Sequence, residues 1–312
     1  MAELIILSVR EANLLRKRLR SLLELRHELV QHPDKETVHD LRVSSRRARE
    51  ILDYMQSGIP ENLFKRMQGP ARNITSQLGK LRETEVNLKL CEELREKKLI
   101  PPLATELLKH KLMKRSRKLQ RKVNKQMKSK NFHVYRKFLS RLKGSRMMLP
   151  VSQEVLQRRA MEFYNFTLHE ELNDEELHEL RILTKKFRYA MEIHNRLRNL
   201  KLGRFVLQLK RLQELLGDIH DLYVFANLVK DEAVNWGETP GLKIIPEALD
   251  SAIQVVVKQK ERLYPRVRVL YHRILEHSPE NIRPVPRKEI RTAEGPTSEM
   301  LTRSQSPYLK IS

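Results

Sequence analysis

The sequence has few of the residues that cross-link or bend a chain. Among its 312 residues there is one cysteine, Cys91, and there are only 9 glycines. A lone thiol cannot form a disulfide within the chain, and scarce cysteine is typical of proteins in a reducing cytosol. With 40% hydrophobic and 32% charged residues, so little glycine favours long amphipathic helices over sheet. We therefore expect an all-α, cytoplasmic protein.

The features of secreted and membrane-spanning proteins are also missing. The chain opens with MAELIILSVR, which places an acidic residue before a very short apolar run and lacks the basic segment of a signal peptide. No stretch reaches the run of about 18 apolar residues that a membrane-spanning helix requires. The sequence thus predicts neither a signal peptide nor a membrane span.

Acidic residues are scarce in the first half. Residues 1–150 hold 36 Lys and Arg against 16 Asp and Glu, whereas residues 151–312 hold 26 against 23. The net charge of +23 indicates a polyanionic partner, such as nucleic acid, an anionic membrane or a phosphate polymer. Part of the surplus lies on one face of an expected helix, either as a nonspecific basic flank or as an extended anion track: Lys111, Arg115, Lys118 and Lys122.

Helical periodicity runs through most of the chain. It predicts helices over residues 3–31, 35–57, 61–97, 103–129 and 132–143, and then over 151–171, 174–199, 203–236 and 246–277. Asp34 and the pair Asn173-Asp174 are expected N-caps. The glycines of the segments LGK (Leu78 to Lys80) and LGD (Leu216 to Asp218) predict a kink or break in the third helix of each half.

One segment occurs twice. VHDLRVSSRRAR (Val38 to Arg49) aligns with LHELRILTKKFR (Leu177 to Arg188), and the two copies share the His, the Leu and two Arg. The motifs are 139 residues apart and the LG pairs 138 apart, which indicates an internal duplication. We predict one domain over 1–278, built of two four-helix bundles related by a pseudo-twofold axis, at about 3–145 and about 151–277. Residues 279–312, with five prolines, are expected to form a disordered tail.

The cations of each copy form one ribbon on a helical wheel, at about 100° per residue. The first ribbon is His39, Arg42, Arg46 and Arg49, and the second ribbon is His178, Arg181, Lys185 and Arg188. Arg47 and Lys186 lie off the ribbons and are expected to make other contacts or to belong to the extended anion track. Like charges so spaced destabilise a helix by some tenths of a kcal/mol per pair. A ligand with closely spaced negative charges would relieve this repulsion, and the planar fork of Arg suits phosphate. The plain alternative is a solvated basic face.

The histidines and the LG segments add to this prediction. A His at the same point of each ribbon is interpreted as a phosphate hydrogen-bond donor, and no metal site is expected because the arginines oppose a cation. RNITSQLGKLRETEV aligns with KRLQELLGDIHDLYV, which pairs Arg72 with Lys210 and adds both to the predicted site. Glu83 and Asp221 are expected to hold the ribbon arginines through salt bridges. The alternative for these segments is that glycine lets two helices approach closely.

With these residues in view, the chain resembles the CHAD domain (conserved histidine α-helical domain) over about residues 3–277. The resemblance rests on both His-x-Leu-Arg-(Val/Ile) motifs and on both LG-x-x-(Arg/His)-(Glu/Asp) segments. It implies two pseudo-symmetric four-helix bundles around a basic central groove or pore, lined by both ribbons. It also implies binding of inorganic polyphosphate, or of phosphate or sulfate ions in its place, and association with polyphosphate granules.

The sequence departs from the family pattern in places. Lys185 and Lys186 replace two arginines of the first copy and supply point charges instead of forks, and RETEV stands where Arg-Asp-x-Asp-Val is common. Many CHAD domains are fused to a triphosphatase domain that needs Glu-x-Glu-x-Lys on a strand. The nearest string here, ETEVN, ends in Asn87 and lies in an expected helix. We therefore expect no fused triphosphatase.

The sequence is consistent with three alternative functions. The first is noncatalytic polyphosphate binding, with no cofactor and no membrane partner. The second is nonspecific nucleic-acid binding, which the lack of aromatic residues within the ribbons disfavours. The third is an enzyme that hydrolyses polyphosphate or carries phosphate on His39 or His178. The absence of an acidic pair beside either ribbon argues against metal-assisted phosphoryl transfer.

Overall fold

A computed structural model of the protein describes residues 7–31, 34–142, 153–238 and 244–279. The first half comprises α1 (Val9–Gln31), α2 (Lys35–Tyr54), α3 (Glu61–Glu96), α4 (Pro102–Met127) and α5 (His133–Arg141), with 3₁₀ turns at Gln56–Gly58 and Lys130–Phe132. The second half comprises α6 (Gln153–Tyr164), α7 (Asp174–Arg198), α8 (Gly203–Gly237), α9 (Ile244–Glu261) and α10 (Tyr264–Glu276). Within these residues all regular structure is helical, which confirms the predicted all-α class.

The helices that carry the two ribbons begin where the sequence indicates. Asp34 caps α2 and accepts a hydrogen bond from the backbone N–H of Thr37 at 2.7 Å. Asn173 caps α7, and its side chain and that of Glu176 form a reciprocal capping box. These caps satisfy N–H groups that have no partner inside the helix, and they fix where each motif lies along its helix.

The helices that carry the LG segments are not broken. The α3 and α8 helices run without interruption through Gly79 and Gly217, so the predicted break is absent at both places. An interior glycine costs a helix only about 1 kcal/mol relative to alanine. A fully buried leucine anchors each helix next to its glycine, Leu78 in α3 and Leu216 in α8. A Cβ atom on either glycine would meet nothing within 4 Å. Close approach of a second helix therefore does not explain these glycines either.

Other boundaries also differ from the prediction. The expected closing helix over 246–277 is two helices, because Pro265 lacks an N–H and stands in the first turn of a new helix, α10. The α6 helix ends at Tyr164 rather than at residue 171. Its end is held by Tyr271, whose hydroxyl donates to the carbonyls of Phe163 and Phe166 at 2.8 and 2.7 Å. The predicted disordered tail falls almost wholly on residues 280–312, which lie outside the described residues.

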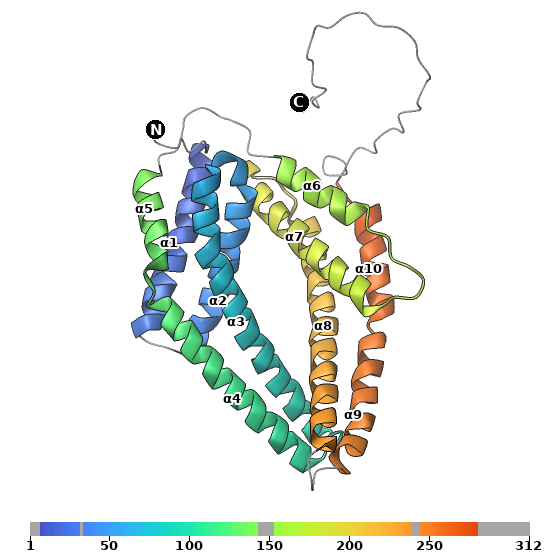
Figure 1. Cartoon of the computed structure of the whole chain (residues 1–312). Helices are drawn as coiled ribbons and strands as arrows, with labels where there is room; N and C mark the ends of the chain where they lie inside the picture. The colour runs from blue at the N-terminus through green and yellow to red at the C-terminus, as the bar shows by residue number, and fades with distance from the viewer. Residues whose placement is uncertain (1–6, 32–33, 143–152, 239–243, 280–312) are drawn as a thin grey trace, which may run out of the picture.

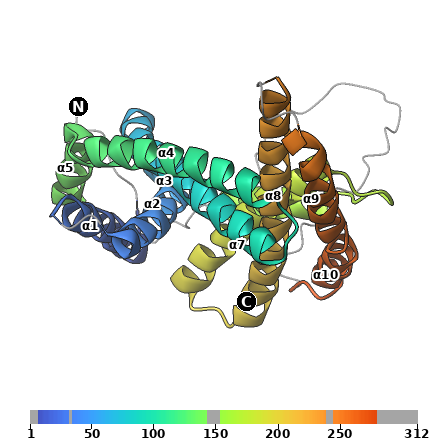
Figure 2. The same ribbon diagram turned by 90° about the horizontal axis from the view of Figure 1, so that it is seen from below.

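The two halves form two limbs that meet at both ends of the molecule (Figure 1). At one end α2 packs on α7, and toward the other end α3 packs on α8. The main hydrophobic core combines residues of α1 to α3 with residues of α6 to α8 and α10. A second core fills the opposite end, where α3 and α4 meet α8 and α9 (Figure 2). Two shared cores fix the halves relative to each other and so set the spacing of the ribbons.

The helices were also compared with the dimensions of a bilayer. Over the stretches that the structure describes, none is both long enough and apolar enough to cross a membrane.

Candidate functional site

The helices that carry the two ribbons, α2 and α7, pack on each other. Arg46 of α2 is close enough to Arg181 and Lys185 of α7 to lower the pKa of both side chains. Its guanidinium also lies 5.4 Å from the ring centroid of Tyr189 on α7. The Nε of Arg46 is buried and has no hydrogen-bond partner among the described residues. A fixed cation from the first half is thus held against the cations of the second.

Lys185 occupies the most strongly perturbed position of the second ribbon. Burial, with the nearby Arg181, Arg49 and Arg46, lowers its pKa to about 8, and Glu50 opposes the fall. Two of these three arginines belong to the other half of the chain. Cations of the same sign are therefore crowded into a half-buried space that lacks enough carboxylate to balance them.

The long helices α3 and α8 place further charged and polar side chains next to the two ribbons. Burial lowers the pKa of Arg42, and Arg46 and Arg82 of α3 lower it further. Burial also lowers the pKa of Arg181, which Asp221 of α8 partly opposes. We call the set contributed by the four helices the central cluster, and its members are Arg42, Arg46, Arg82, Arg181, Lys185 and His220.

His220 is the member of the central cluster that loses its charge most readily. Burial lowers its pKa to about 4, and Arg181, His178 and Lys185 contribute to the fall. Its ring centroid lies 5.3 Å from that of His178. At neutral pH His220 is consequently a neutral imidazole, which can donate one hydrogen bond to an anion or gain a proton when an anion arrives.

Asp221 and Tyr189 are the other polar groups in direct reach. Burial raises the pKa of Asp221, and Arg181 and Arg82 hold that rise back. Tyr189 is 4% exposed, and its hydroxyl has no hydrogen-bond partner among the described residues. A buried O–H without an acceptor carries a free-energy cost of about 1–3 kcal/mol. An anion bound between the ribbons would supply that acceptor.

The last cation of each ribbon is already paired with a carboxylate. Arg49 lies 2.8 Å from Glu50, which also accepts from the buried Arg159 at 3.3 Å. Arg188 is buried, forms an ion pair with Glu192 and donates to Gln213 of α8 at 2.8 Å. The third cation of each ribbon therefore stabilises the helix packing through these pairs, and Arg49 also adds to the fall that burial causes in the pKa of Lys185.

The remaining residues of the predicted site lie in solvent. His39 and His178 are exposed at the N-terminal ends of the ribbons. Arg72 is exposed on α3, and it is among the arginines that oppose the rise that burial causes in the pKa of Asp53. Lys210 is exposed on α8 and lies 3.5 Å from Glu214. The described contacts do not place these two LG-segment cations in the central cluster.

The predicted outer track divides into paired and unpaired cations. Lys111 forms an ion pair with Glu232 of α8, and Arg115 lies 3.0 Å from Glu83 of α3. Glu83 thus pairs with α4, and among the described residues no ion pair joins Glu83 or Asp221 to a ribbon arginine, although Asp221 opposes the fall in the pKa of Arg181 that burial causes. In the part of the chain that the structure describes, no ion pair involves the exposed Lys118 and Lys122 of α4.

The two off-ribbon cations lie in separate pockets. Arg47 lines a pocket between α2 and the end of α7, and Lys186 lines another between α7 and α8, which also contains His178 and His220. Both side chains are exposed. The expectation that they make contacts of their own therefore agrees with their position.

Three residues that face the ribbons were not part of the predicted site: Arg82, His220 and Tyr189. Arg82 and His220 occupy matching positions after the two LG pairs, so the alignment of the halves contains the signal for both. Tyr189 has no such signal, because the matching residue of the first half is Glu50. Its role depends on the packing of α2 on α7.

Comparison with known proteins gives one family. The profile of the CHAD domain matches residues 13–230. Two solved structures share the fold: "PptA from Streptomyces chartreusis" has a TM-score of 0.64 at 17% identity, and the match covers 86% of this chain and 98% of that one. The "CHAD domain from the plant Ricinus communis" has a TM-score of 0.60 at 20% identity, with 87% and 94% covered. A search of curated proteins finds no match.

Proposed function

Because the chain belongs to the CHAD domain family, we propose that it binds inorganic polyphosphate at the central cluster without catalysing a reaction. The ligand class follows from the family resemblance and from the charge of the cluster. The residues follow from the structure: Arg42 and Arg46 on one side, Arg181 and Lys185 on the other, with Arg82 and His220 beneath. Each half supplies one wall, so the ligand bridges them.

One observation carries this proposal most directly. Cations from both halves lie close together at a buried position, and burial together with Arg181, Arg49 and Arg46 lowers the pKa of Lys185 to about 8. Burying unbalanced charge destabilises a fold, so the arrangement is explained by a ligand that balances it. The unpartnered Nε of Arg46 and hydroxyl of Tyr189 add two donors that need an acceptor. A chain of phosphates offers acceptor oxygens and closely spaced negative charge together.

The residues near the central cluster favour contacts with phosphate groups over recognition of nucleobases. The aromatic residue beside the central cluster, Tyr189, is buried. The guanidinium carbons of Arg46 and Arg188 lie 5.4 and 4.1 Å from the centroid of its ring. Its ring faces are therefore not free to stack on a nucleobase, which is the usual source of single-strand affinity. Phosphate contacts alone would remain, and polyphosphate offers the most of these per unit length.

The first test is a comparison of ligands at equal charge. Binding of long-chain polyphosphate, single-stranded DNA, double-stranded DNA and RNA would be measured at several salt concentrations. We expect polyphosphate to bind tightest at each salt concentration and its affinity to fall as salt rises, because counterions are released on binding. Equal binding of a nucleic acid would overturn the choice of polyphosphate. Release of phosphate from the bound polymer, with a divalent metal present, would overturn the noncatalytic assignment.

The second test locates the site. Arg42→Gln and Arg181→Gln each remove one charge-assisted contact, worth about 1.5–3 kcal/mol, so affinity for polyphosphate should fall about 10- to 100-fold. The matched control is Lys118→Gln, which removes one charge from the exposed face of α4. If the control weakens binding as much as the two ribbon variants, the net charge of the chain and not the central cluster holds the polymer.

Binding to the polymer also predicts a location in the cell. We propose that the protein accumulates on polyphosphate granules, because a granule presents many copies of the ligand. A fluorescent fusion should coincide with polyphosphate staining, and the Arg42→Gln, Arg181→Gln double variant should be dispersed. A double variant that stays on granules would show that another surface recruits the protein.

A further inference from the structure

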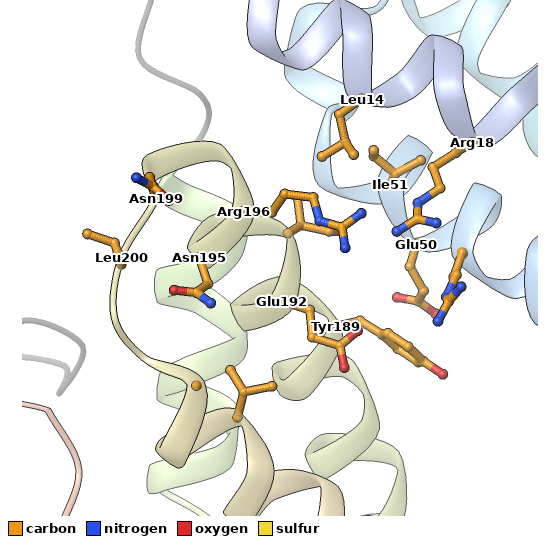
Figure 3. Close-up of a pocket in the computed structure, with 14 residues that line it drawn as sticks. Leu14, Arg18, Glu50, Ile51, Tyr189, Glu192, Asn195, Arg196, Asn199 and Leu200 are labelled. Carbon is orange, nitrogen blue, oxygen red and sulfur yellow. The ribbon is translucent and has the colours of Figure 1, made fainter.

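A second group of arginines lies on the other side of α2. A pocket of about 480 Å³ opens between α1, α2, α7 and the start of α8, and it contains Arg18, Arg47 and Arg196. Arg18 and Arg196 project into it from opposite walls (Figure 3). Arg47 follows Arg46 in sequence and so points about 100° away from it around the helix. The pocket and the central cluster are therefore on different faces of α2.

The charge in this pocket is positive and unbalanced. Its two carboxylates are engaged elsewhere: Glu50 pairs with Arg49 at 2.8 Å and Arg159 at 3.3 Å, and Glu192 pairs with Arg188. In contrast, the three pocket arginines form no ion pair with any residue that the structure describes. Burial lowers the pKa of Arg18, and Arg47 and Arg196 lower it further, while Glu192 opposes the fall.

The other residues that line the pocket do not suit inorganic polyphosphate. Aliphatic side chains cover much of the wall, and two amides stand near the end of α7; these residues are Leu14, Ile51, Ile193, Leu200, Val206, Asn195 and Asn199. Polyphosphate has no apolar part, so aliphatic walls would contribute nothing to binding it. A flat organic group that bears phosphates would fit both the arginines and the rest of the lining. Aliphatic side chains would pack on its faces, and the amides would donate to and accept from its edge.

We propose that this pocket binds a nucleoside di- or triphosphate, with the phosphates held by Arg18, Arg47 and Arg196 and the base between the aliphatic walls. The volume of about 480 Å³ is within the range of pockets that enclose a ligand of this size. Arginine forks donate two hydrogen bonds to one phosphate, and three of them match a di- or triphosphate. The site shares no arginine with the central cluster, and Tyr189, whose ring Arg46 contacts, is the residue of its lining that adjoins that cluster.

The test uses the full chain and ATP as the probe, without metal, by calorimetry. Arg18→Gln and Arg196→Gln should each weaken ATP binding by at least about tenfold, whereas Arg42→Gln in the central cluster and Lys118→Gln on α4 should leave it unchanged. Pyrophosphate should bind at least about tenfold more weakly than ATP, because it lacks the base. Polyphosphate affinity should be the same for Arg196→Gln and the unaltered protein.

Each other outcome overturns the proposal. No ATP binding at millimolar concentration removes the ligand, and loss of ATP binding in Arg42→Gln moves it to the central cluster. Equal affinity for pyrophosphate and ATP reduces the pocket to a simple anion site. Arg196 is exposed, so its substitution tests the pocket even if the half-buried Arg18→Gln variant fails to fold, and thermal unfolding of each variant separates the two effects.

Discussion

The two ribbons have the same spacing of cations but differ at their middle position. Arg46 of α2 is a guanidinium that stays charged and contacts Tyr189, whereas Lys185 of α7 is an ammonium whose pKa falls to about 8. The next difference is between the matching residues Glu50 and Tyr189. Glu50 neutralises arginines at one end of the α2–α7 contact, and Tyr189 leaves a donor unsatisfied. The two ribbons therefore differ in the kind of cation at the middle position and in how the charge beside it is balanced.

The largest expected effect comes from removing both middle cations. The double variant Arg46→Gln, Lys185→Gln should weaken polyphosphate binding about 100-fold or more at pH 7, because each change removes a charge-assisted contact. The two single variants should differ above pH 8.5, where Lys185 is already largely neutral and Arg46 is not. Titration calorimetry of all three variants at two pH values measures both effects, and equal single-variant losses at high pH would contradict the comparison.

The next effect is a change in pH dependence. An anion favours the protonated form of Lys185, so polyphosphate affinity should fall as pH rises above about 8, by up to tenfold per pH unit for one proton. Lys185→Arg makes the two walls alike, and its affinity should stay level over the same range. Binding measured from pH 7 to 9.5 at constant ionic strength checks this, and an equal slope in both proteins would assign the pH dependence to another group.

A smaller effect is expected at the last cation of each ribbon, and on stability rather than on binding. Arg188→Ala removes a buried side chain that pairs with Glu192 and Gln213, so we expect a loss of about 1–3 kcal/mol in the free energy of unfolding. Arg49→Ala should cost less, because Arg49 is more exposed and Glu50 keeps its contact with Arg159. Urea unfolding measures both. A larger loss of polyphosphate affinity in either variant than in Arg42→Gln would contradict this division of roles.

The smallest effect should come from the two motif histidines. His39 and His178 are exposed, and one ordinary hydrogen bond from either side chain to the polymer is worth about 0.5–1.5 kcal/mol. His39→Gln and His178→Gln should therefore weaken polyphosphate binding about two- to tenfold. Phosphorylation of either histidine in the presence of polyphosphate, measured by mass spectrometry, would instead support an enzyme.

Much of the fold and half of the site follow from the sequence. Periodicity and capping residues locate α2 and α7, since Asp34 and Asn173 act locally. The breaks expected at Gly79 and Gly217 are wrong because burial of the neighbouring leucines outweighs the low helix propensity of glycine. A helical wheel identifies which cations share a face of the helix. It does not show that Arg188 contacts Glu192 and Gln213, because these contacts depend on the packing of α7 on α8.

The pairing of Arg82 and His220 with the ribbons likewise depends on tertiary structure. Both residues lie mid-helix on α3 and α8, and the contact of these helices with each other brings them beneath α2 and α7. The alignment of the two halves marks the positions as equivalent, and the structure adds that they are close to Arg42 and Arg181. Positions that align between the two halves of the chain are thus good candidates for one shared site even when their residue types differ.

The pKa of Lys185 with and without polyphosphate tests the central claim most directly. Selective ¹³C labelling of the lysine side chains, with Lys185→Arg to assign the signal, allows the titration to be followed by NMR. The account predicts a pKa of about 8 in the free protein and a clear rise when polyphosphate saturates the site, because the bound anion favours the charged form. A Lys185 pKa that does not change at saturation would place the polymer elsewhere and contradict the account.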